Sequence, residues 1–226
     1  MTISATTQGL RPGVTTSSNR PTTPFEGQMI YETDTDLTYI YGGSAWQQVS
    51  GGTAVGNSGL VYVTSGALSS TATNFAGCFT TTYENYRIVF SKVNVGAGWL
   101  QFQMLNSTTA FASSLYHSAF VSNNSSSGSP ASDRGTAITV GYLGYNFQST
   151  TDGSMSASFD FMNPFGTGRT FFNGQASSYY SVTPFFQVLN GGGGVDSTNS
   201  FDGIRISSSG GGTLIGNVAI YGYRKA

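Results

Sequence analysis

Residues 20–49 read Arg20-Pro-Thr-Thr-Pro-Phe-Glu-Gly-Gln-Met-Ile-Tyr-Glu-Thr-Asp-Thr-Asp-Leu-Thr-Tyr-Ile-Tyr-Gly-Gly-Ser-Ala-Trp-Gln-Gln-Val49. This stretch contains two short runs typical of β-strands, Gln28 to Thr33 and Leu37 to Tyr41, separated by an Asp/Thr turn. Gly42-Gly43 then reverses the chain toward Trp46. The pattern predicts a compact β-hairpin, and an isolated hairpin buries too little apolar surface to be stable alone. We therefore expect another surface to cover it.

Side chains of the hairpin alternate between two faces. Met29 and Tyr31 face one way, whereas Ile30 and Glu32 face the other, together with Gln28. The second run alternates in the same manner, with its aromatic residues on one face. The two aspartates between the runs, at positions 34 and 36, are interpreted as turn residues, because an isolated D-x-D lacks the further oxygen ligands of a calcium site.

Residues 1–24 precede the hairpin and are rich in Thr, Ser and Gly, with prolines at positions 12, 21 and 24. A segment with so few apolar groups cannot form its own core, and prolines favour extended conformations. We expect an extended attachment arm, either a disordered tail or a segment that becomes ordered on another subunit. The residues expected to form the attachment or oligomer interface are Ile3, Leu10, Val14, Phe25, Met29, Tyr31, Tyr39, Tyr41 and Trp46.

The pattern R-P-x-x-P-x-E-G-Q-x-I-Y-E-T-D-T-D at residues 20–36, followed by an aromatic strand and G-S-A-W at 43–46, resembles a module of tailed-bacteriophage virion proteins. Tail fibres, minor tail proteins and head-associated fibres carry similar hairpins. The resemblance covers residues 20–49 with the lead-in 2–13, and it implies a structural protein of the virion. It also implies a homotrimer by analogy, since such fibres are commonly threefold. The motif does not specify head, tail or baseplate.

A glycine-rich stretch without periodicity, residues 51–59, predicts a linker between the hairpin module, 25–50, and a C-terminal domain, 60–226. About eight to nine strands with regular turn signals predict a jelly-roll-like antiparallel β-sandwich there. We interpret Gly191 to Gly194 as a glycine turn and Ser122 to Asp133 as a loop. The expected strands are Leu60 to Thr64, Tyr83 to Val93, Trp99 to Leu105, Ala137 to Phe147, Ser154 to Met162, Arg169 to Asn173, Tyr179 to Leu189, Phe201 to Ser207 and Leu214 to Arg224, whereas the aromatic-rich run Phe111 to Val121 is ambiguous.

The composition supports an all-β protein. Charged residues make up 8% of the chain, against about 25% in typical domains, so Ser, Thr, Asn, Gln and Gly must cover the surface. This surface is typical of particle or extracellular proteins, and equally of an ordinary Ser/Thr-rich sandwich. The 31 glycines and 29 Phe and Tyr residues (16 and 13) suit tight turns between aromatic strands. The net charge of -1 provides no basic field for nucleic acid.

The single cysteine, Cys78, excludes an intrachain disulfide and a metal site built on cysteine pairs. Its neighbours are small or apolar, so we expect it to be a buried small hydrophobe. The N-terminus lacks the basic and apolar regions of a signal peptide, and no run approaches 18 apolar residues. We therefore expect synthesis in a cytoplasm and no membrane insertion, and the resemblance to phage virion proteins implies a final location in the virion.

Candidate catalytic groups are few. His117 is the only histidine, and no nucleophile elbow accompanies it, so a Ser-His-Asp triad is not expected. A glycan-cleaving enzyme would need two paired carboxylates in one groove. The carboxylates outside the hairpin region are Glu84, Asp133, Asp152, Asp160, Asp196 and Asp202. No cofactor or metal site is expected, and we expect the protein not to be an enzyme.

Sugar binding is the more reasonable chemistry, because exposed aromatic rings stack on sugar faces while amides and hydroxyls bind their hydroxyl groups. The rings that flank candidate loops are Tyr116, Tyr145, Tyr179 and Tyr180. Each ring could instead fill the sandwich core or a subunit interface. The resemblance thus implies a virion subunit, a fibre, spike or decoration protein, whose partners are sister copies and other virion proteins. The alternative is a receptor-binding protein that binds or cleaves a host glycan.

Overall fold

The computed structural model describes residues 12–50, 59–124, 131–144, 155–180 and 185–224. The chain divides into two compact units, residues 1–57 and 58–226, here called the N-terminal module and the C-terminal domain. The described residues form strands, with one short 3-10 turn, Ser17–Asn19, and no α-helix. The all-β prediction is therefore confirmed. In the described part of the chain, no helix has the length and apolarity needed to cross a membrane.

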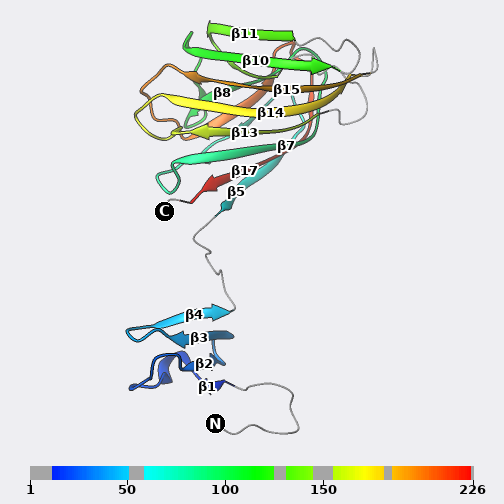
Figure 1. Cartoon of the computed structure of the whole chain (residues 1–226). Coiled ribbons are helices and arrows are strands. Elements are labelled where there is room, and N and C mark those ends of the chain that lie inside the picture. Colours follow the sequence, from blue (N-terminus) through cyan, green and yellow to red (C-terminus); the bar gives the residue numbers. More distant parts are fainter. Residues whose placement is uncertain (1–11, 51–58, 125–130, 145–154, 181–184, 225–226) are drawn as a thin grey trace. The chain divides into compact units, whose positions relative to one another are not determined.

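The N-terminal module is a four-stranded sheet in the order β1-β2-β3-β4 (Figure 1). Its strands are β1 (Gly13–Thr15), β2 (Met29–Glu32), β3 (Leu37–Tyr41) and β4 (Trp46–Ser50). The two predicted hairpin strands are confirmed as β2 and β3, and β4 adds a third antiparallel strand. The expected boundary at residue 24 differs from the structure, because β1 pairs in parallel with β2. Residues 13–15 are thus part of this sheet, not of a separate arm.

The C-terminal domain consists of two antiparallel sheets (Figure 1). The larger has eight strands in the order β11-β10-β15-β14-β13-β7-β17-β5, and the smaller has the order β12-β8-β16-β6, with β9 paired to β8. The strands are β5 (Leu60–Leu68), β6 (Ala72–Phe75), β7 (Asn85–Val95), β8 (Leu100–Asn106), β9 (Thr109–Ala110), β10 (Tyr116–Asn124), β11 (Ala131–Ile138), β12 (Gly141–Gly144), β13 (Met155–Met162), β14 (Thr170–Tyr180), β15 (Phe185–Val195), β16 (Gly203–Ser208) and β17 (Leu214–Tyr223).

An aromatic core joins the two sheets. Phe102 of the smaller sheet is fully buried and lies 5.1 Å from Phe161 and 4.9 Å from Phe172 of the larger sheet, between ring centres. Both contacts are edge-to-face, the geometry that aromatic quadrupoles favour. Cys78 is buried, as predicted, and burial raises the pKa of its thiol to about 12. This core positions the larger sheet with its other face toward solvent.

The glycine run 191–194 corrects one prediction. It forms the second half of β15, where it pairs with β10 and β14, and is not a turn. A Cβ atom on Gly193 would lie 1.9 Å from the carbonyl oxygen of His117, and one on Gly192 would lie 2.2 Å from that of Phe172. The strands therefore approach so closely that only glycine fits. The predicted loop at 122–133 is also shorter, since β10 continues to Asn124 and β11 begins at Ala131.

Candidate attachment site in the N-terminal module

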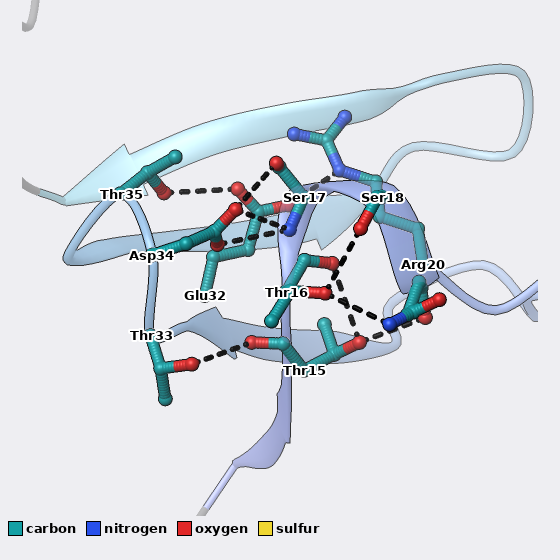
Figure 2. A network of polar contacts seen from close by, with 10 residues as sticks. Thr15, Thr16, Ser17, Ser18, Arg20, Glu32, Thr33, Asp34 and Thr35 are labelled. Carbon is teal, nitrogen blue, oxygen red and sulfur yellow. Dashed lines mark hydrogen bonds and ion pairs between the residues drawn. The ribbon is translucent and has the colours of Figure 1, made fainter.

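A buried carboxylate lies at the centre of the N-terminal module. Glu32 is fully buried, and its Oε1 accepts a hydrogen bond from Nε of Arg20 at 2.5 Å. Oε2 accepts a second bond from the Thr35 hydroxyl at 2.9 Å. The Arg20 guanidinium also lies over the Tyr39 ring, 4.3 Å from its centre. These bonds, led by the one from Arg20, hold the pKa of Glu32 below its ordinary value. Figure 2 shows Arg20, Glu32 and Thr35 in this network.

A second carboxylate fastens the segment after β1 to the turn after β2. The backbone N–H and the hydroxyl of Ser17 donate to Asp34, at distances of 2.9 Å and 2.6 Å (Figure 2). The backbone N–H of Thr33 donates to the Thr15 carbonyl at 2.9 Å and continues the pairing of β1 with β2. The bonds from Ser17 hold the pKa of Asp34 below its ordinary value. Residues 15–17 and 33–34 therefore form one connected unit.

The turn between β2 and β3 has the conformation that its aspartates favour. Asp36 has φ 55°, a left-handed conformation that Asp tolerates better than most residues. Its carboxylate accepts a hydrogen bond from the Tyr31 hydroxyl at 2.7 Å, and this bond raises the pKa of Tyr31. Asp34 and Asp36 are turn residues, as predicted. Within the described ranges, no group of three or more His, Cys, Asp or Glu side chains could hold a metal ion.

The two faces of the module differ in what covers them. Ile30 and Glu32 are buried on one face, where the register places Tyr39 opposite Ile30 and the Arg20 guanidinium lies over the ring. We call the other face the open face and define it by Val14, Met29, Tyr31 and Ile40. The register pairs Val14 with Tyr31 and Met29 with Ile40 across neighbouring strands. Val14 is 50% exposed and Met29 48% exposed, so the open face presents apolar side chains to solvent.

The predicted attachment residues do not form one surface. Val14, Met29 and Tyr31 lie on the open face, whereas Tyr39, Tyr41 and Trp46 alternate onto the covered face. Tyr41 and Trp46 pack against each other with ring centres 5.4 Å apart. Phe25 lies in the loop before β2 and is 70% exposed. The remaining two, Ile3 and Leu10, lie outside the described residues.

The predicted receptor-contact tyrosines also separate. Tyr116 is fully buried, where its hydroxyl donates to the Phe111 carbonyl and accepts from the Met104 N–H, which corrects the expectation of an exposed ring. Tyr179 is half-buried and packs against Phe186, with ring centres 5.1 Å apart. Tyr145 and the side chain of Tyr180 lie outside the described part. Sequence reasoning missed Phe186, which is 68% exposed. The reason is that residues 179–189 were predicted as one strand, whereas β14 ends at Tyr180 and β15 begins at Phe185.

Three of the six candidate catalytic carboxylates, Asp160, Asp196 and Asp202, make separate structural contacts. Asp160 accepts two bonds from Arg87, at 2.8 Å and 2.7 Å, and a third from the Tyr223 hydroxyl at 2.6 Å. Asp196 pairs with Arg169, Asp202 accepts a bond from the Ser107 N–H, and Glu84 is exposed. Asp152 and the side chain of Asp133 lie outside the described residues.

In comparisons with known proteins, no family model, no curated protein and no solved structure matches this chain. The structure shows an all-β protein with a small four-stranded module and a two-sheet domain.

Proposed function

We propose that this chain is a structural protein of a tailed-bacteriophage virion, a fibre, spike or decoration subunit located on the particle. The N-terminal module attaches the chain to the particle and to sister copies. The C-terminal domain is then the part presented to the host surface. The proposal starts from the sequence resemblance at residues 20–49 and gains support from what those residues do in the module.

One observation carries the proposal. The residues of the R-P-x-x-P-x-E-G-Q-x-I-Y-E-T-D-T-D pattern make the module's internal contacts, with Arg20 on Glu32, Ser17 on Asp34 and Tyr31 on Asp36. Only Ile30 and Glu32 are buried in the described part of this module. A unit with so small a core gains stability by covering its apolar surface with another chain. The pattern thus specifies a scaffold that keeps the open face available for docking.

The connectivity of the C-terminal domain supports a finer description. We infer a jelly roll built from eight strands in the orders β5-β17-β7-β13 and β6-β16-β8-β12. Along the chain these strands alternate between the two sheets, except that β8 and β12 both belong to the smaller sheet. The strands β10, β11, β14 and β15 extend the larger sheet beyond β13. They are additions to this eight-strand arrangement, and they create most of the outer surface considered below.

We further propose that the open face mediates a homotrimer as well as docking to the particle. In an oligomer with closed cyclic symmetry, the apolar face of every subunit is covered by a neighbouring subunit. Sedimentation of the purified full-length chain measures this directly, with a trimer expected for the wild type and monomers for a chain that carries polar residues at Val14 and Met29.

Particle incorporation tests the attachment role. We expect the double variant V14S/M29S to fold normally, since both side chains are about half exposed, but to be absent from purified particles or reduced at least tenfold. The readout is immunoblotting of particles produced by a phage that carries the variant. The apolar contact area lost on the open face accounts for the defect.

The matched control is I215S in the C-terminal domain, because Ile215 is 59% exposed and apolar but lies on the other unit. It should incorporate at the wild-type level. Normal incorporation of V14S/M29S would show that the open face is not the attachment surface, and the function proposed for the module would then fail.

A second candidate function, host-glycan binding, is favoured by one observation. The larger sheet of the C-terminal domain exposes aromatic rings on its outer face, among them Phe186 and its neighbour Tyr179. Exposed rings of this kind serve as stacking platforms for sugars. Particles whose incorporation is normal but whose adsorption to host cells is competed by free host polysaccharide would support this function.

A further inference from the structure

The outer face of the larger sheet is hollowed along β15. Side chains of β10 and β14 stand on both sides of this strand, but β15 contributes only glycine from position 191 to 194. At the end of the run, Gly194 lies between His117 of β10 and Phe171 of β14 in one row across three strands. Directly opposed residues share a face of the sheet, so these two side chains flank a floor without side chains.

A cleft of about 430 Å³ lies at this position, within the range of about 300–1,000 Å³ that is usual for small-molecule sites. The residues that line it are His117, Arg169, Thr170, Phe171, Gly193, Gly194, Val195 and Asp196. Phe171 is 54% exposed, and its Cδ1 would lie 3.4 Å from a Cβ placed on Gly194. The ring therefore stands beside the glycine floor with much of its surface available for stacking.

The polar end of the cleft is an ion pair. Nε of Arg169 donates to Oδ1 of Asp196 at 2.5 Å, and both side chains are about half exposed. The Asp196 backbone N–H donates to the Leu115 carbonyl at 2.8 Å, which fixes the position of the aspartate. This pair uses only Nε of Arg169 and Oδ1 of Asp196. The two terminal amino groups of Arg169 therefore remain as donors, and Oδ2 of Asp196 remains beside them as an acceptor.

Two further polar residues line the cleft, Thr170 and His117. Thr170 pairs with the buried Val195, and its side chain is fully buried on the core face of the sheet, so only its backbone borders the cleft. The half-buried His117 adds a ring nitrogen donor or acceptor on the opposite side.

We propose that this cleft binds a pyranose sugar. The Phe171 ring stacks on the apolar face of the sugar, and the Arg169–Asp196 pair binds two neighbouring hydroxyl groups, one as acceptor and one as donor. Because the floor of the cleft has no side chains, the sugar ring can approach the sheet closely. A neutral, hydroxyl-rich ligand fits better than a phosphate or nucleic acid, because Asp196 compensates the charge of Arg169 and the whole chain has a net charge of -1.

The binding is a property of the C-terminal domain, and only its biological role rests on the function proposed above. The test uses the full-length chain and saturation-transfer NMR with D-glucose, D-galactose, D-mannose and N-acetyl-D-glucosamine as separate probes. We expect saturable binding of at least one of them with a Kd of about 1 mM, the usual scale of a contact this small.

The informative variants are F171A and D196N, each expected to weaken that binding about tenfold or more, a loss of about 1.4 kcal/mol or more in binding free energy. The matched control is F186A, which removes another exposed ring of the larger sheet and should change the Kd less than twofold. Unchanged thermal melting verifies that each variant is folded. D196N keeps the test valid if F171A does not fold.

Absence of binding for all four sugars would overturn the proposal, as would equal losses in F171A and F186A. Either result leaves the attachment function intact, because V14S/M29S tests a surface on the other unit. Conversely, if V14S/M29S is incorporated normally and the sugar binding is saturable, the attachment function fails and the sugar site is supported.

Discussion

Glu32 is the residue on which the N-terminal module depends. Burying a carboxylate is costly unless charged and polar partners bind it, and here Arg20 and Thr35 bind both oxygen atoms. Removing one partner from such a site is more damaging than an exposed substitution, because the other partner is left without its bond. The Arg20 guanidinium also lies over the Tyr39 ring.

We predict that E32Q loosens the whole module without affecting the C-terminal domain. Loss of the negative charge weakens the bond from Arg20, so amide hydrogen exchange in residues 13–41 should accelerate at least tenfold when it is followed by mass spectrometry of the full-length chain. The control is E26Q, the same chemical change at an exposed position of the module. Equal exchange in E32Q and E26Q would contradict a structural role for the buried carboxylate.

At the scale of elements, β15 shows a strand in which only glycine fits between its neighbours. At positions 191 to 193, a Cβ atom would lie within 2.2 Å of a backbone carbonyl oxygen of β10 or β14. The exposed cleft beside Phe171 is a direct consequence of this packing.

We predict that G193A destabilises the C-terminal domain by about 3 kcal/mol or more, the upper range for inserting atoms into a packed site. The reason is that its Cβ would lie 1.9 Å from the His117 carbonyl oxygen, a backbone atom that cannot move alone. The graded control is G194A, whose nearest contact would be 3.0 Å, with an expected loss of about 1 kcal/mol. Urea unfolding measures both, and similar losses would contradict the close approach.

Elements with regular alternation could be predicted from the sequence, and others could not. Met29 and Tyr31 were correctly placed on the face opposite Ile30, because period-two alternation is a local property. The glycine run was misread as a turn, since glycine serves both turns and close strand packing and the difference depends on neighbouring strands. The parallel pairing of β1 with β2 was missed for the same reason. The three residues of β1 lie between polar residues, and nothing in their sequence indicates with which strand they pair.

The candidate sites show the same limit. The pattern at residues 20–41 predicted the hairpin but not which side chains point outward. The prediction grouped Tyr39 with Met29 as interface residues, although they lie on opposite faces. The cleft at Phe171 has no sequence signature, because Arg169, Asp196 and His117 come from separate strands or strand ends. Only the strand register brings them together.

At the scale of the whole molecule, the two units have very different reserves of stability. The C-terminal domain has a large aromatic core, whereas the described part of the module buries Ile30 and Glu32 and relies on charged contacts. Conditions that remove charge should therefore unfold the module first. A partially unfolded chain with an intact C-terminal domain is the expected intermediate.

We predict that acidification unfolds the N-terminal module before the C-terminal domain. In unfolded chains, Glu and Asp have pKa values of about 4.3 and 3.9, and the folded-state pKa values of Glu32 and Asp34 lie lower. Between the two ranges the unfolded chain binds more protons than the folded one, so stability that is complete at neutral pH is lost as pH falls from about 5 through the lowered pKa values. NMR amide signals of Ser17 should shift to unfolded positions before those of Phe172.

The C-terminal domain is subject to the same linkage but should resist longer. Burial opposes ionisation of Asp160, yet the hydrogen bonds from Arg87 and Tyr223 lower its pKa overall. Loss of that one contact leaves the aromatic core in place. Simultaneous loss of the Ser17 and Phe172 signals would contradict independent unfolding of the two units.

The pairing of β5 with β17 brings both ends of the C-terminal domain to one corner. Leu60 lies opposite Tyr223, and the Arg224 N–H reaches the Gly59 carbonyl at 3.5 Å. A short peptide could join these ends, so a circular permutant opened in another turn should retain every strand pairing. Cargo genetically appended after residue 224 would likewise emerge at that corner, leaving the cleft beside Phe171 unobstructed for display or capture on a surface.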